Sequence, residues 1–141
     1  MKKLLLLMFC AISLSTFAQK KVKDADYYYN SAQQEPTFMA YLKAKRQFDE
    51  KRDEFKLPKS PEAVQEIEKN RDKIMKNERT YAEFLSKHGM ANAGEYASLW
   101  FNQLTTLKTF IKKNPQFGNL SVSDRQKIIS KWYYADESAK K

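Results

Sequence analysis

The segment 95–113 constrains the fold most, because its apolar residues repeat with the period of an α-helix. Side chains three or four positions apart lie on the same side of a helix. The residues spaced in this way are Tyr96, Trp100, Leu104, Leu107 and Ile111. Leaving such side chains in water would forfeit roughly 1.5–3 kcal/mol each. The sequence therefore predicts a central helix that the other segments must cover.

Three further segments, 36–55, 61–87 and 123–136, have helical patterns, and the period-two alternation of strands is absent. Their expected core positions are Ile67, Ile74, Tyr81 and Leu85 in the second segment and Ile128 and Trp132 in the third. Few turn signals are present, so hairpins of strands are not expected. The predicted fold class is all-α, a small helical bundle of about four main helices, with an additional short helix at 24–34 as an option.

The segments 36–55 and 61–87 are predicted to form an antiparallel helical hairpin about Pro58. In that register Lys45 lies within a turn of Glu78. The aliphatic parts of both side chains would then lie along the interface between the helices, and the ammonium would meet the carboxylate. We therefore expect an ion pair between Lys45 and Glu78.

The first eighteen residues have the pattern of a secretory signal peptide. A short basic start precedes the apolar stretch 4–14, and small residues lead to an expected cleavage between Ala18 and Gln19. The apolar stretch is shorter than the roughly 20 residues that a membrane-spanning helix needs. A lipoprotein signal at Cys10 fits less well, because Phe9 is bulky where a small residue is preferred. We expect export to the bacterial periplasm or beyond, with no transmembrane segment in the mature chain.

Cleavage after residue 18 would leave 141 minus 18, or 123, residues, which suffices for one core. The expected organisation is a signal peptide (1–18), a basic and tyrosine-rich N-terminal arm (19–35), a helical bundle domain (36–137) and a flexible tail (138–141). The tyrosines at 27–29 are expected to anchor the arm to the bundle.

The chain is basic, with 26 Lys and Arg against 17 Asp and Glu and a formal net charge of +9. Such an excess favours anionic partners, including an anionic surface or an acidic protein. The simpler interpretation is that the charges cover solvated helix faces. The lysines are spread along helices rather than gathered in one block, so no nucleic-acid partner is expected.

Few residues suited to catalysis remain after the signal peptide. The only cysteine, Cys10, leaves with it, and the chain has a single histidine, His88, and three separate glycines. Histidine-dependent nucleophilic catalysis, zinc–thiolate sites and glycine-rich phosphate loops all need more than this. We expect His88 to lie exposed or to interact favourably with a helix C-terminus. No catalytic, cofactor-binding or metal-binding residues are predicted.

Since no catalytic residues are predicted, we expect the protein to act by binding. The leading hypothesis is a non-enzymatic exported protein that binds another protein, in the manner of an inhibitor or immunity protein. One alternative is a basic periplasmic holdase chaperone or a binder of the envelope surface. A second is a hydrolase of unknown type, because two carboxylates in a cleft would suffice for glycoside hydrolysis. The sequence does not locate the binding surface.

Overall fold

The computed structural model describes residues 22–138, and this part of the chain contains α-helices, two short 3-10 helices and no strand. The elements in order are α2 (Ala25–Ser31), η1 (Ala32–Gln34), α3 (Pro36–Lys51), η2 (Arg52–Glu54), α4 (Pro61–Ile74), α5 (Glu78–Lys87), α6 (Ala93–Lys113), α7 (Pro115–Gly118) and α8 (Val122–Ser138). The expected signal peptide, its cleavage between Ala18 and Gln19, and positions 139–141 of the expected tail lie outside the described residues.

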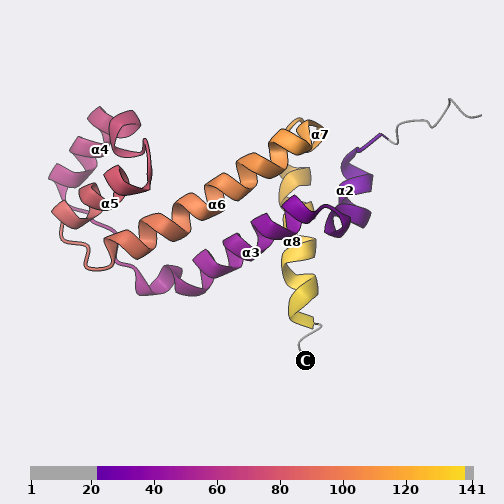
Figure 1. Cartoon of the computed structure of the whole chain (residues 1–141), viewed down its shortest axis with the longest axis horizontal. Helices are drawn as coiled ribbons and strands as arrows, with labels where there is room; N and C mark the ends of the chain where they lie inside the picture. Colours follow the sequence, from indigo (N-terminus) through magenta and orange to yellow (C-terminus); the bar gives the residue numbers. More distant parts are fainter. Residues whose placement is uncertain (1–21, 139–141) are drawn as a thin grey trace, which may run out of the picture.

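The all-α prediction is confirmed, but the helices do not form a simple bundle around α6. Helices α3 and α6 run antiparallel along each other and make the most extensive helix contact of the described chain (Figure 1). Helices α4 and α5 lie at the N-terminal end of α6, whereas α2, α7 and α8 lie at its C-terminal end (Figure 1). We call the α3–α6 pair the shaft. The fold is therefore elongated, with a group of helices at each end of the shaft.

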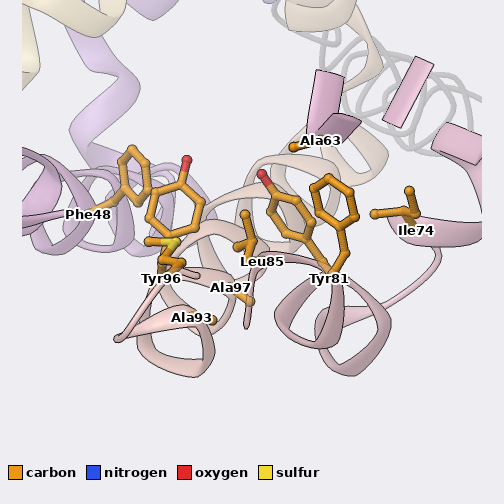
Figure 2. Close-up of a cluster of buried hydrophobic side chains, with 10 residues drawn as sticks. Phe48, Ala63, Ile74, Tyr81, Leu85, Ala93, Tyr96 and Ala97 are labelled. Carbon is orange, nitrogen blue, oxygen red and sulfur yellow. The ribbon is translucent and has the colours of Figure 1, made fainter. Parts of the chain in front are cut away.

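Buried residues of α3, α4, α5 and α6 form one apolar cluster, the first core (Figure 2). The Phe48 ring of α3 contacts two rings of α6, with centroids 5.5 Å from Tyr96 and 5.7 Å from Trp100. Tyr81 of α5 approaches Tyr96 from the other side at 6.2 Å. Tilted aromatic pairs at such distances stabilise a core beyond the effect of their buried area. Leu85 and Ile74 complete this cluster from α5 and α4.

A second core lies at the other end of the shaft and is built mainly of aromatic rings. The Phe110 ring of α6 lies 5.2 Å from Phe38 of α3 and 4.8 Å from Phe117 of α7. Tyr28 of α2 closes the cluster with its ring 5.2 Å from Phe117. Ile128 brings α8 to the same cluster and is buried. Three short or terminal helices are thus fixed to the end of the shaft by one set of rings.

The middle of α6 is covered less completely than the sequence analysis predicted. Ala97 and Phe110 are fully buried, but the predicted core residues between them, Trp100, Leu104 and Leu107, are only half-buried. Leu104 belongs to neither core. A 21-residue helix is about 30 Å long, which neither α4 nor α5 can span, so α3 alone runs along it. The expectation that the other segments would wrap α6 along its length is therefore wrong.

The segment 61–87, predicted as one helix, is two helices joined by a turn. The backbone leaves helical geometry at Asn70, and α4 ends at Ile74. Asn77 then starts α5: its side chain accepts a hydrogen bond from the Thr80 amide, and the Thr80 hydroxyl faces the Asn77 amide. Such a capping box satisfies two amides that a helix start leaves free. Two short helices can fold back on one another at the end of the shaft, as a single long one could not.

The predicted hairpin of 36–55 with 61–87 is also wrong, and so is the ion pair between Lys45 and Glu78. Helix α3 packs along α6 instead of lying against one long neighbouring helix. The Lys45 ammonium lies 2.7 Å from Asp49, one turn further along α3, and Glu78 is exposed. An i,i+4 partner on its own helix is available to Lys45 whichever helix packs beside it.

Residues assigned by sequence to an N-terminal arm belong to the packed structure from residue 24 onward. Asp24 caps α2 by accepting a hydrogen bond from the Tyr27 amide at 2.9 Å. Tyr28 is fully buried in the second core, and its carbonyl accepts a hydrogen bond from the indole N–H of Trp132 at 3.1 Å. The helical domain therefore begins before Pro36.

A polar network ties the start of the described chain to the C-terminal end of α6. Lys23 contacts the Glu35 carboxylate and donates to Asn114 Oδ1 at 3.1 Å, and the Tyr27 hydroxyl donates to Glu35 at 2.9 Å. Asn114 is 2% exposed, and its Nδ2 also donates to the Phe110 carbonyl at 3.3 Å. Because a buried amide must find partners, this network fixes the end of α6 against the N-terminal segment.

The two cores lead to a prediction about matched truncations in α6. Phe110→Ala should lower the free energy of unfolding by about 3–5 kcal/mol, because it removes a fully buried ring that three other rings contact. Leu104→Ala should cost less than about 2 kcal/mol, because that side chain is only partly buried and belongs to neither core. Urea unfolding followed by circular dichroism measures both. Equal losses would mean that the middle of the shaft is packed as tightly as the second core.

The Glu35 network predicts how stability depends on pH. Partial burial alone would raise the pKa of Glu35, but hydrogen bonds from Lys23 and Tyr27 outweigh it and leave the pKa below the ordinary 4.5. A lowered carboxylate pKa stabilises the fold above the unfolded pKa, and this stabilisation is lost as the pH falls through the folded value. Glu35→Gln should therefore be less stable near pH 7, and its free energy of unfolding should fall less than that of the wild type on acidification. Parallel pH profiles for the two proteins would contradict this.

Candidate interaction surface

Helix α8 crosses α3 and is fixed to it by an arginine. The Arg46 guanidinium of α3 donates from Nη2 to the backbone carbonyls of Trp132 at 3.1 Å and Tyr133 at 2.8 Å. A carbonyl within a helix retains a second lone pair, so it can accept such a bond without losing its helical partner. The remainder of α8 extends past α3 (Figure 1). Two crossing helices thereby leave a hollow between them.

The hollow, which we call the α3–α8 cleft, is open to solvent and has a volume of about 380 Å³. Its lining residues are Lys45, Asp49 and Arg52 on the α3 side and Ile129, Ser130, Tyr133 and Tyr134 of α8. Ligand-binding clefts in proteins commonly have volumes of about 300–1,000 Å³. The cleft is large enough to receive one or two side chains of a partner.

Two tyrosines form the α8 wall of the cleft. The Tyr133 ring lies within 5.3 Å of the Lys45 ammonium and 5.4 Å of the Arg46 guanidinium carbon, both measured to the ring centroid. Tyr134 meets Tyr133 edge to face at 5.1 Å, and 62% of its surface is exposed. Cations over a tyrosine face are attracted by the ring's negative surface. Tyr133 is thus held in place, whereas Tyr134 offers its ring to solvent.

The α3 wall carries the charge of the cleft. Lys45 and Asp49 pair at 2.7 Å, with side chains 27% and 20% exposed. Arg52 stands at the rim with its side chain 62% exposed, and its Nε is 3.5 Å from Asp53, a distance too long for a strong hydrogen bond. An exposed pair such as Arg52 and Asp53 contributes little to stability. Two cations against one carboxylate give the cleft a net positive charge.

The single histidine occupies a structural site at the other end of the molecule. His88 Nε2 lies 2.9 Å from Glu66 of α4, and the His88 ring packs 4.8 Å from Phe84. Lys87 reaches the same carboxylate at 2.7 Å. Hydrogen bonds from Lys87 and His88 lower the pKa of Glu66. These contacts tie α4 to the end of α5, and sequence spacing gave no sign of Glu66 as the partner of His88.

A shallow apolar groove of about 140 Å³ lies between α4 and α5. Leu57 and Val64 form its exposed rim, and Ile67, Tyr81 and Leu85 lie along its floor.

Within residues 22–138, no group of three or more histidine, aspartate and glutamate side chains is placed to hold a metal ion.

The predicted core residues divide between the two ends of the shaft. Those that are buried in the first core are Ile74, Tyr81, Leu85 and Tyr96, and Ile128 is buried in the second. Those that are half-buried against a core are Ile67, Trp100, Leu107, Ile111 and Trp132. Leu104 is half-buried in the middle of the shaft.

Sequence reasoning missed the cleft, although one signal for it was present. Tyr133 and Tyr134 are adjacent, and neighbouring residues on a helix point about 100° apart. If Tyr133 packs toward α3, Tyr134 must point partly away from the core. The cationic residues that face them come from α3, and no local pattern joins these two segments.

None of the helices within residues 22–138 combines the length and apolar character needed to cross a membrane. Comparison of the chain with models of protein families, with curated proteins and with solved structures finds no match.

The anchoring of α8 by Arg46 can be tested by substitution. Arg46→Ala should lower the free energy of unfolding by about 1–3 kcal/mol, because it removes charged hydrogen bonds to two carbonyls. Arg46→Lys should restore only part of that loss, since an ammonium lacks the planar fork of the guanidinium. Urea unfolding gives the free energies, and intrinsic tryptophan fluorescence in a Trp100→Phe background shows whether Trp132 becomes more exposed. An unchanged stability in Arg46→Ala would mean that α8 is held by the second core alone.

Proposed function

We propose that this protein acts in the bacterial envelope by binding another protein without catalysing a reaction, as an inhibitor or immunity protein does. The contact surface in this proposal is the α3–α8 cleft. The observation that carries it is that the exposed ring of Tyr134 on α8 and the exposed guanidinium of Arg52, which caps the C-terminal end of α3, line the same cleft. Tyrosine and arginine are enriched among residues that dominate the energy of protein interfaces.

The rigidity of the two walls supports this use of the cleft. Arg46 fixes α8 to α3, and Trp132 fixes α8 to the Tyr28 carbonyl of α2. A surface that is already ordered loses less conformational entropy when a partner binds. Tyrosine adds contact area at a small entropic cost because it has few rotatable bonds.

The N-terminal pattern supports the proposed location. A basic start, an apolar stretch and small residues before Gln19 together favour export by a secretory route. The periplasm, or the space beyond it, is then where a partner would be met.

Site-specific photo-crosslinking tests the proposed surface. A photoreactive phenylalanine analogue in place of Tyr134 should capture one stoichiometric protein in cells of the native host, because that ring would face the partner. The same analogue at Arg79, an exposed position of α5 at the other end of the molecule, serves as the matched control and should capture none. Identical products from both positions would contradict the proposal. Capture of many unrelated unfolded proteins would instead favour the holdase hypothesis.

A further inference from the structure

We infer that the α3–α8 cleft recognises an acidic peptide segment of its partner, with Arg52 and Lys45 as the groups that receive carboxylates. This inference rests on the proposed function and specifies the chemistry of that same site. It follows from three observations: the charge of the cleft, the state of its carboxylate Asp49, and the shape made by the two crossing helices.

The charge of the cleft favours a negatively charged ligand. Within residues 22–138, the guanidinium of Arg52 has only the distant contact with Asp53, whose own side chain is 92% exposed. The planar guanidinium of arginine can therefore turn toward an incoming carboxylate and bind it through two parallel hydrogen bonds. The Tyr134 ring, which lines the same cleft, can pack against the apolar part of the ligand side chain that carries this carboxylate.

Within the cleft, the Asp49 carboxylate competes with a ligand carboxylate for the ammonium of Lys45. Its carboxylate holds Lys45 at 2.7 Å inside the cleft, which is where a ligand carboxylate would have to bind. The two residues are one turn apart on the same helix, and such pairs are held together by little free energy, so a ligand carboxylate can replace Asp49. Removing the charge of Asp49 should consequently make the cleft more receptive to acidic ligands.

The shape of the cleft favours a peptide over a membrane surface. Lys45 and Asp49 are mostly covered, at 27% and 20% exposed, whereas Tyr134 on the protruding α8 is well exposed. A flat bilayer would touch the ridge of α8 without reaching the covered residues of α3. A convex peptide segment can enter between the helices and reach both cations.

The test uses the full chain and a fluorescein-labelled peptide of eight glutamates, with a peptide of eight glutamines as the uncharged comparison. Fluorescence anisotropy at low salt should show binding of the glutamate peptide alone. Arg52→Glu should weaken that binding about tenfold, and Asp49→Asn should strengthen it about threefold, as expected when one charge contact is lost or freed. Binding should weaken as salt rises to 0.1 M, where charges are screened over roughly 10 Å.

Arg79→Glu is the matched control, because it changes the net charge by the same amount as Arg52→Glu but lies on α5, away from the cleft. It should alter binding less than twofold. Equal weakening by both variants would overturn the inference, since binding would then follow net charge alone. Binding of anionic phospholipid vesicles that Arg52→Glu abolishes, without binding of the peptide, would also overturn it and would indicate a lipid surface as the ligand.

The outcomes separate this inference from the proposed function. Crosslinking at Tyr134 without any binding of the glutamate peptide would overturn the acidic ligand and leave the protein-binding surface standing. Cleft-dependent peptide binding without a crosslinked protein partner would establish the chemistry of the cleft and contradict the proposed function.

Discussion

The aromatic seam between α3 and α6 is the contact on which the rest of the structure depends. Phe48 meets Tyr96 and Trp100 at one end of the seam, and Phe38 meets Phe110 at the other. Each contact also belongs to one of the two cores, so the helices at both ends are organised by the same pair of long helices. Lys45 and Asp49 of the cleft lie on the α3 helix of this shaft, and Arg52 caps the C-terminal end of that helix.

The fold class could be predicted from sequence because helical periodicity is a local property. The residues of 95–113 repeat at helical spacing whatever lies beside them, and the helix Ala93–Lys113 matches that range closely. Periodicity identifies an apolar face but not the helix that covers it. For this reason the segment 36–55 was paired with 61–87, whereas α3 packs along α6. Leu104 shows the same limit: its spacing places it on the apolar face, yet it belongs to neither core and no helix besides α3 runs along the middle of α6.

The candidate site could not be derived from sequence because its parts meet only through tertiary packing. Arg46 and Trp132 are 86 residues apart, and their hydrogen bond joins α8 to α3. The charge of Lys45 was recognised, but its partner was placed on the wrong helix because the neighbour of α3 was assigned wrongly. The adjacent tyrosines at 133 and 134 were the one local sign that a ring would face outward.

The half-buried middle of the shaft has a consequence for how the molecule opens. Cooperative unfolding depends on continuous burial, and here the two cores are connected by one pair of helices whose central contacts are partly hydrated. Amide hydrogens of α4 and α5 can therefore exchange with solvent through a separate opening from those of α2 and α8. A partner that bridges α3 and α8 would connect α8, which packs on the second core, with the part of α3 next to Phe48 of the first core, and would therefore slow exchange at both ends of the molecule.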